Sequence, residues 1–227
     1  MTTNRRTQAV LFDIDGTLIS TGGASDRAWK RAFKELHGVD VDVPAVTGKG
    51  VPDPEVGWVV FTTALGREPT EEEAAAVMRR RLDHLSEEVE NSPGFVVHDG
   101  VVDLLERLID EGLMLGLTTG NVEEAAHIKL ARANLNRFFS FGGYGSDSPN
   151  RTELTKRALE RAALVSGDTL QHDRCFSCGD TPRDVEAGHG AGIRVVGVAT
   201  GEFTVEQLLE AGADAAVASL REGLPLL

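Results

Sequence analysis

Hydrophobic and polar residues follow two different periods along this chain. Short apolar runs, each followed by a polar or glycine-containing turn, predict buried strands. Between these runs, apolar residues recur at every third or fourth position, which predicts amphipathic helices. Strands that alternate with helices favour a parallel sheet covered on both faces, so we expect an α/β fold. The expected strands cover residues 10–12, 113–117, 138–141, 174–178, 193–198 and 215–217.

The helices expected between the later strands begin at capping residues. Asp99 is a candidate N-cap for a helix that ends at Gly112, and Thr204 opens a capping box with Gln207 for a helix that ends near Ala211. Other helices are expected from the turn at 118–121 to about residue 133, over about 152–164, and after residue 182.

Residues 21–94 show helical periodicity in three stretches, with loops where prolines and glycines at 44–54 interrupt the chain. One helix is expected to end at Gly38, a second to cover about 54–65, and a third to run from a capping box at Thr70 and Glu73 to about Glu90. Small or turn-forming residues stand at both ends of the segment. We therefore expect a small all-helical domain over residues 21–94, inserted after the first strand into a discontinuous α/β core of residues 1–20 and 95–227.

Two aspartates follow the first strand in the stretch Val10-Leu11-Phe12-Asp13-Ile14-Asp15-Gly16. They stand at the carboxyl edge of the predicted sheet, where open α/β sheets bind their ligands. Strand alternation starts Asp13 and Asp15 on one face. Two adjacent carboxylates repel each other unless a cation lies between them, and closely spaced oxygen ligands suit Mg²⁺.

Two more polar turns are expected at the same edge. Thr118-Thr119-Gly120-Asn121 follows a strand, and its hydroxyls and backbone amides could hold a phosphoryl oxygen, although such a turn is also an ordinary connection. The turn 179–184 contains Asp180 and Asp184. Asp184 suits the first turn of a helix that is capped by Thr181. Alternatively, both acids belong to a metal site, because four carboxylates at one edge of the sheet are unfavourable without a cation.

These motifs, in this order, resemble those of the haloacid dehalogenase (HAD) superfamily, in particular phosphoglycolate phosphatase-like members with a helical type 1 cap. The resemblance implies a Rossmann-like core with a helical cap domain. It also implies that Asp13 attacks phosphorus to give an aspartyl-phosphate, with Asp15 as general acid and then base. Thr119, with Thr118 as its rival, would contact the phosphoryl group together with Gly120 and Asn121. Mg²⁺ would be held by Asp13, the Asp15 main-chain carbonyl, Asp180 and Asp184.

The superfamily also places a Lys or Arg before a helix between the last two motifs. This chain lacks the common Lys-Pro pair there, so Arg151 is the candidate and Lys156 the alternative. Either cation could stabilise the nucleophile and the phosphoryl charge. In the predicted cap, Lys49 lies in a glycine-flanked loop and could contact a substrate carboxylate or second phosphate.

The composition and net charge of the chain limit the classes of partner that it is expected to bind. The chain has 227 residues and a net charge of −13, which argues against nucleic acid or an anionic membrane as the main partner. No apolar run is long enough for a transmembrane helix and no signal peptide is recognisable, so a cytoplasmic location is expected. Cys175 and Cys178, the only cysteines, form a CxxC that could indicate redox or zinc chemistry, but buried residues of a core strand are the simpler interpretation.

The sequence thus predicts a Mg²⁺-dependent phosphatase that hydrolyses a small phosphorylated metabolite and acts as a monomer or homodimer. Phosphoglycolate, a sugar phosphate, a nucleotide and pyrophosphate all remain candidate substrates. The alternatives are a phosphomutase or a dehalogenase of the same superfamily, or a catalytically silent binding or regulatory protein.

Overall fold

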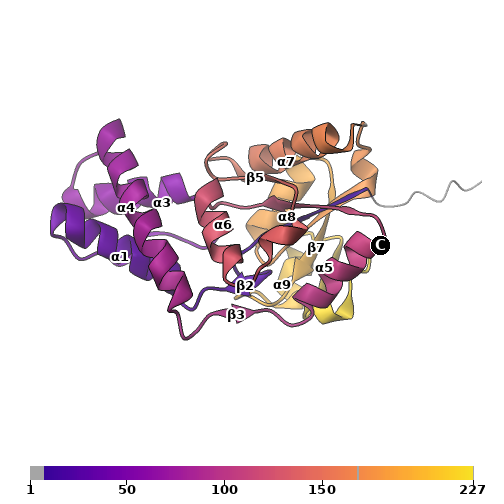
Figure 1. Ribbon diagram of the computed structural model, residues 1–227. Coiled ribbons are helices and arrows are strands. Elements are labelled where there is room, and N and C mark those ends of the chain that lie inside the picture. The colour runs from indigo at the N-terminus through magenta and orange to yellow at the C-terminus, as the bar shows by residue number, and fades with distance from the viewer. Residues whose placement is uncertain (1–7, 168, 227) are drawn as a thin grey trace, which may run out of the picture.

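The computed structural model describes residues 8–167 and 169–226 and contains a six-stranded parallel sheet (Figure 1). Its strand order is β5-β4-β1-β6-β7-β8. The chain runs outward from β1 through β4 to β5 and then returns to the other side of β1 for β6. The carboxyl end of β1 therefore lies at a topological switch point, where such sheets bind ligands. The strands are β1 Ala9–Phe12, β4 Met114–Thr118, β5 Phe141–Gly143, β6 Cys175–Gly179, β7 Arg194–Val198 and β8 Ala215–Val217.

Helices cover both faces of the sheet, and the side chains of β1 alternate between them. Val10 and Phe12 pack into the core that includes residues of α5 (Val101–Asp110) and α6 (Glu123–Ala131). Ala9 and Leu11 pack on the opposite side, in the core that includes residues of α7 (Arg151–Ser166). Helices α8 (Pro182–Gly190) and α9 (Val205–Glu210) contact β7. The expected α/β fold with a parallel sheet is confirmed.

Four helices precede β3 and form a separate group at one end of the molecule (Figure 1). They are α1 Ala24–His37, α2 Val43–Val46, α3 Asp53–Leu65 and α4 Glu71–Glu90. The predicted capping box at Thr70 and Glu73 is present, while the short helix α2 was not expected from the sequence. This group has its own apolar core, made of Trp29, Phe33, Val43, Val56, Val60, Phe61 and Val77.

A two-stranded antiparallel ribbon, absent from the sequence prediction, joins this helical group to the sheet. It pairs β2 (Ile19–Ser20) with β3 (Val96–Val97). Just beyond the ribbon, the two backbones touch, since a Cβ at Gly22 would lie 2.4 Å from the carbonyl carbon of Gly94. The chain thus leaves and re-enters the sheet region at one place.

Three local predictions were wrong. Asp99 does not cap α5, whose N-cap is Gly100; the Asp99 carboxylate accepts from Arg221 instead. Residues 136–138 form a 3₁₀ turn, so the strand expected at 138–141 begins only at Phe141. Helix α7 begins at Arg151 rather than after it, because the Asn150 side chain caps the backbone amides of the two residues that follow Arg151. Across the described part of the chain, no helix combines the length and apolar character needed to cross a bilayer.

Candidate active site

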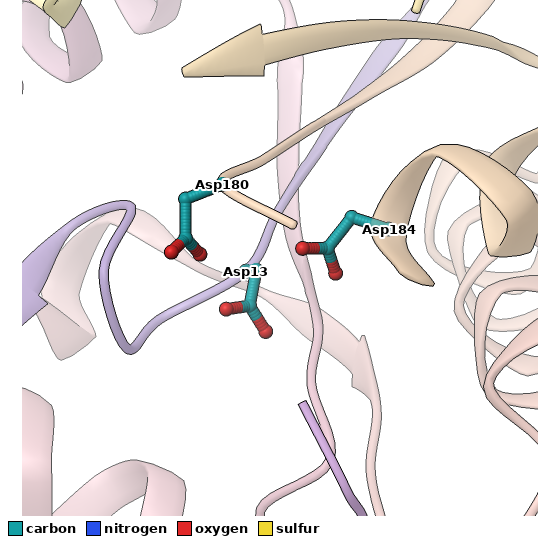
Figure 2. Close-up of side chains that lie close together, drawn as sticks. All are labelled: Asp13, Asp180 and Asp184. Carbon is teal, nitrogen blue, oxygen red and sulfur yellow. The ribbon is translucent and has the colours of Figure 1, made fainter. Parts of the chain in front are cut away.

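Three buried carboxylates meet at the carboxyl edge of the sheet (Figure 2). Asp13 follows β1, Asp180 follows β6, and Asp184 lies in the first turn of α8. Each offers an oxygen that lies within 4.8 Å of the others, and no more than 6% of any of the three residues is exposed. The parallel register of β1 with β6 brings the first two together, because Phe12 pairs with Cys178 and the two aspartates follow within two residues.

Burial, together with charge repulsion within the cluster, raises the pKa values of two of these carboxylates. Burial, followed by the charge of Asp184, raises the pKa of Asp13 to about 7. Burial and the charges of Asp13 and Asp184 raise the pKa of Asp180 to about 8. Buried carboxylates at this spacing are hard oxygen donors whose ionisation is unfavourable without a cation, so the three residues fit a divalent ion such as Mg²⁺.

The backbone is shaped to admit Asp180. A Cβ at Gly16 would lie 2.2 Å from an Asp180 carboxylate oxygen, and one at Gly201 would lie 1.9 Å from it. Gly16 also has a φ of 87°, which favours glycine. The Thr17 hydroxyl donates to Asp180 at 3.3 Å. Any side chain at Gly16 would therefore displace a member of the acid cluster.

Asp184 serves two purposes that the sequence presented as alternatives. One of its oxygens accepts from the backbone amide and hydroxyl of Thr181, at 3.0 and 2.7 Å, and completes the capping box of α8. Its other oxygen is ion-paired with Arg151 and belongs to the acid cluster. The capping contact fixes the carboxylate that the cluster uses.

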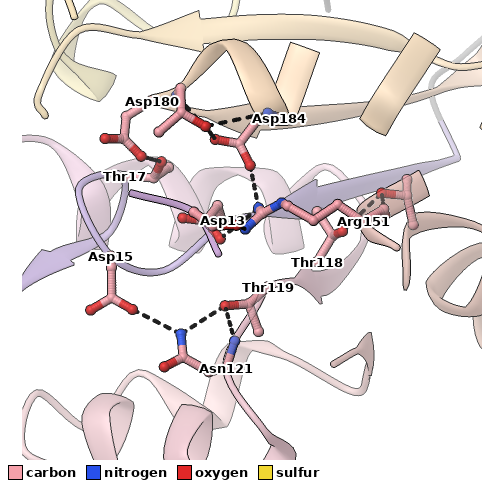
Figure 3. A network of polar contacts seen from close by, with 12 residues as sticks. Asp13, Asp15, Thr17, Thr118, Thr119, Asn121, Arg151, Asp180 and Asp184 are labelled. Atoms are coloured by element: carbon pink, nitrogen blue, oxygen red, sulfur yellow. Dashed lines mark hydrogen bonds and ion pairs between the residues drawn. The ribbon is translucent and has the colours of Figure 1, made fainter. Parts of the chain in front are cut away.

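Arg151 is the cation beside Asp13 (Figure 3). Its guanidinium lies 3.2 Å from an Asp13 oxygen and also binds Asp184. Burial disfavours the charge of this guanidinium, but Asp184 and Asp13 outweigh that penalty and raise its pKa. Lys156, the alternative, is exposed and pairs with Glu153 on its own helix. The structure therefore brings Arg151, and not Lys156, to the acid cluster.

Asp15 does not join the other carboxylates. All four predicted carboxylates line one cavity, but the expectation that Asp13 and Asp15 share one face by strand alternation is wrong. Strand β1 ends at Phe12 and the chain turns at Gly16, so the alternation no longer applies. One oxygen of Asp15 accepts from Lys129 Nζ at 2.6 Å and from Asn121 Nδ2 at 2.8 Å. Burial raises the pKa of Asp15, but Lys129 and Asn121 outweigh this and hold the pKa below its usual value.

The turn after β4 offers a hydroxyl to the same cavity. Thr119 is buried and lines the cavity, and its oxygen accepts from Asn121 Nδ2 at 2.8 Å, which leaves its proton free to be donated. The Thr118 hydroxyl instead contacts Thr155 at 3.0 Å (Figure 3). Gly120 lies against the α2–α3 loop, where its carbonyl accepts from the Asp53 amide at 2.7 Å.

Comparison with known proteins agrees with this architecture. The family model described as "Haloacid dehalogenase-like hydrolase" matches residues 10–198. The chain belongs to this family. Both the expected resemblance and the expectation of a hydrolase are confirmed.

Relatives of this HAD-family hydrolase match along most of its length. A phosphorylated carbohydrates phosphatase from Thermotoga maritima is 27% identical over 92% of this chain and 94% of the relative. A phosphoglycolate phosphatase from Rhodobacter capsulatus is 25% identical over 83% of this chain and 82% of the relative. The structure of CbbY from Rhodobacter sphaeroides in complex with phosphate is similar in fold, with a TM-score of 0.75, 19% identity, and coverage of 95% of this chain and 96% of that one.

Lys129 was missed by sequence reasoning although it contacts a predicted site residue. This α6 lysine in the HAD-family chain is 2% exposed, and its ammonium donates to Asn121 as well as to Asp15, at 2.6 Å each. It follows Ala125 and Ala126 by four and three positions and shares their buried helix face. A lysine on an otherwise apolar helix face was the sequence feature that could have identified Lys129 as a site residue.

A second missed contact joins the helical group to the turn after β4. Asp53, at the start of α3, forms a two-point ion pair with Arg81 of α4, with both N–O distances at 2.9 Å. The same Asp53 carboxylate accepts from the Val122 amide at 3.0 Å. Arg81 lies one helical turn from Val77 and from Leu85, on the buried face of α4. A charged residue at such a position in the sequence could have indicated this contact.

The remaining candidates are Lys49 and the two cysteines of the CxxC. Lys49 lines the cavity but is two-thirds exposed, with its ammonium 3.6 Å from a Glu202 oxygen. Cys175 and Cys178 are buried on opposite faces of the sheet, in different cores. They therefore cannot bind one zinc ion or form one disulfide in this fold, and the simpler interpretation of the CxxC is confirmed.

Proposed function

We propose that this HAD-family chain is a Mg²⁺-dependent phosphatase that hydrolyses a small phosphomonoester through an aspartyl-phosphate. The supporting observation is the position of Asp13, buried between two further carboxylates and Arg151 at a cavity of about 370 Å³. In this proposal, residues 21–94 form a cap domain over a core of residues 1–20 and 95–227. The names of relatives, which act on phosphorylated carbohydrates and phosphoglycolate, agree with the reaction class.

In the first half-reaction, a carboxylate oxygen of Asp13 attacks phosphorus and the bond to the leaving oxygen breaks. Arg151 favours the ionised form of Asp13, which is the nucleophilic form. The free proton of the Thr119 hydroxyl and the amides of the turn at Gly120 donate to phosphoryl oxygens. Asp15 gives a proton to the leaving alcohol.

In the second half-reaction, Asp15 takes a proton from water, the water oxygen attacks phosphorus, and the bond from phosphorus to Asp13 breaks. After Asp15 has given its proton to the leaving alcohol, the ion pair with Lys129 stabilises the resulting carboxylate, which is the form that accepts this proton. The Asn121 side chain is hydrogen-bonded to Asp15, Thr119 and Lys129, so in this proposal it orients these three side chains.

The acid cluster is the proposed metal site. Asp13, Asp180, Asp184 and the Asp15 main-chain carbonyl would hold Mg²⁺, which supplies positive charge against the nucleophile and the phosphoryl oxygens. A dehalogenase needs neither this cluster nor a second acid. The cluster therefore favours phosphoryl chemistry over the dehalogenase alternative.

Phosphate release from p-nitrophenyl phosphate, with Mg²⁺ and with a chelator, tests the proposal. We expect metal-dependent release that Asp13→Asn abolishes, while the exposed Asp103→Asn keeps wild-type activity. Acid-quenched wild-type protein should carry one phosphoryl group, and Asp13→Asn should carry none. Release that survives either the chelator or Asp13→Asn would contradict the mechanism. Folded protein that binds Mg²⁺ but releases no phosphate would favour the phosphomutase or binding-protein alternatives.

A further inference from the structure

The cavity extends from the acid cluster to the helical group, and this second part is where a leaving group would lie. Its lining there comes from α1, α2, α3 and the loop between α2 and α3. If phosphorus lies beside Asp13, the rest of the substrate faces these helices. The following inference rests on the proposed phosphatase function.

The cations that line the cavity, within residues 8–167 and 169–226, all have acidic partners. Arg151 is held by Asp13 and Asp184, and Lys129 is held by Asp15. A third cation, Lys49, pairs with Glu202 at the exposed side of the cavity. Within the described residues, a second phosphate or a carboxylate on the leaving group would therefore meet no lining cation that is free of an acidic neighbour.

Asp26 adds a negative charge to this part of the cavity. It lies in the first turn of α1, lines the cavity and is half-buried. Its carboxylate makes no hydrogen bond or ion pair with any other residue that the structure describes. An ionised carboxylate accepts hydrogen bonds only, so it attracts hydroxyl donors and repels anions.

The neighbouring wall combines apolar and hydroxyl groups. Trp29, Val43 and Val56 line the cavity next to the hydroxyl residues Ser25 and Thr47. The Ser25 oxygen accepts from Arg81, which leaves its own proton free for a ligand. Apolar surface beside donors and acceptors suits a ring or chain that carries several hydroxyls. The volume of about 370 Å³ lies near the low end of the roughly 300–1,000 Å³ found for small-molecule sites.

We propose that the leaving group is an uncharged, hydroxyl-bearing alcohol of monosaccharide or polyol size, and that Asp26 selects it against carboxylates and second phosphates. Asp26 accepts a hydrogen bond from a hydroxyl of the leaving group. The selection against anions follows from the same carboxylate, because each cation that lines the cavity within the described residues already has an acidic partner.

Glycerol 3-phosphate and 3-phosphoglycerate form a matched pair for the test, since they have the same carbon number and differ in a terminal alcohol or carboxylate. We expect kcat/KM to favour glycerol 3-phosphate about tenfold or more. Glucose 6-phosphate should likewise be preferred to 6-phosphogluconate and to fructose 1,6-bisphosphate. Asp26→Asn should reduce these ratios at least severalfold, while Glu35→Gln, an exposed change on the same helix, should leave them unchanged.

Two results would overturn the inference while the phosphatase proposal stands. One is equal or faster turnover of 3-phosphoglycerate or phosphoglycolate, especially if Lys49→Ala removes that preference. The other is a set of ratios that Asp26→Asn does not change. Failure of the phosphatase proposal itself would appear differently, as the absence of Mg²⁺-dependent release from p-nitrophenyl phosphate.

Discussion

The buried ion pair between Arg81 and Asp53 yields a quantitative prediction. Arg81 is fully buried, binds both Asp53 oxygens at 2.9 Å, and places its guanidinium carbon 5.0 Å from the centre of the Trp29 ring. Arg81→Met removes the counter-charge and leaves the Asp53 carboxylate buried, with the Val122 amide as its remaining partner. Breaking one side of a buried pair costs about 3–5 kcal/mol of unfolding free energy. For a chain of this length, that corresponds to a fall in Tm of roughly 6–20 °C.

The double variant Asp53→Asn/Arg81→Met separates the cost of an unpaired charge from the value of the pair. Asp53→Asn alone leaves Arg81 without its counter-ion, so it should also destabilise by about 3–5 kcal/mol. In the double variant neither charge remains, so the loss should be clearly smaller than the sum, with a coupling energy above about 1 kcal/mol.

Urea unfolding followed by far-UV circular dichroism and tryptophan fluorescence is the assay. Trp29, one of two tryptophans in the chain, touches Arg81 and reports on this place directly. Arg79→Met, an exposed change on the same helix, is the control and should shift stability by no more than about 0.5 kcal/mol. A loss below about 1 kcal/mol for Arg81→Met, or strict additivity in the double variant, would refute the reasoning.

Three further predictions concern the site and the cysteines. Because the folded-state pKa values of Asp13 and Asp180 are raised to about 7 and about 8, metal-free protein should lose stability as pH rises from about 4 to 8. In thermal melts, Mg²⁺ should remove this loss of stability. A Tm of the metal-free protein that does not change with pH would contradict the raised pKa values. Lys129→Met should raise the pKa of Asp15, move the acidic limb of the kcat profile to higher pH and lower kcat about 10²-fold; an unchanged profile would mean that Lys129 is only structural. Burial raises the pKa of the Cys175 thiol to about 11, so iodoacetamide should label it only after unfolding, as mass spectrometry would detect.

Much of the sheet was predictable because local patterns and long-range packing agree there. The residues of β1 alternate between two buried cores, and the aspartate that follows it reaches the edge that parallel strands share. The capping box of Thr181 and Asp184 was predictable for the same reason. The position of Asp184, three residues after Thr181, allows it both to cap α8 and to belong to the acid cluster.

The features that sequence reasoning missed depend on where separate elements meet. Nothing local to Lys129 indicates that its ammonium reaches Asp15, which is 114 positions earlier. The position of Asp15 itself follows from a turn, where the two-residue strand period ends. The β2–β3 ribbon is two residues long on each side, too short to leave a pattern in the sequence.

That ribbon also bears on how such a chain can change over evolutionary time. Ser20 and Val96 are direct partners across it, so the two ends of the long intervening segment are neighbours in space. A segment whose ends adjoin can be lengthened, shortened or exchanged by recombination without altering the strand order β5-β4-β1-β6-β7-β8. Asp13, Asp180 and Asp184 all lie outside the exchanged segment. Under the proposed function, exchange of this segment changes the leaving-group preference while the acid cluster stays the same.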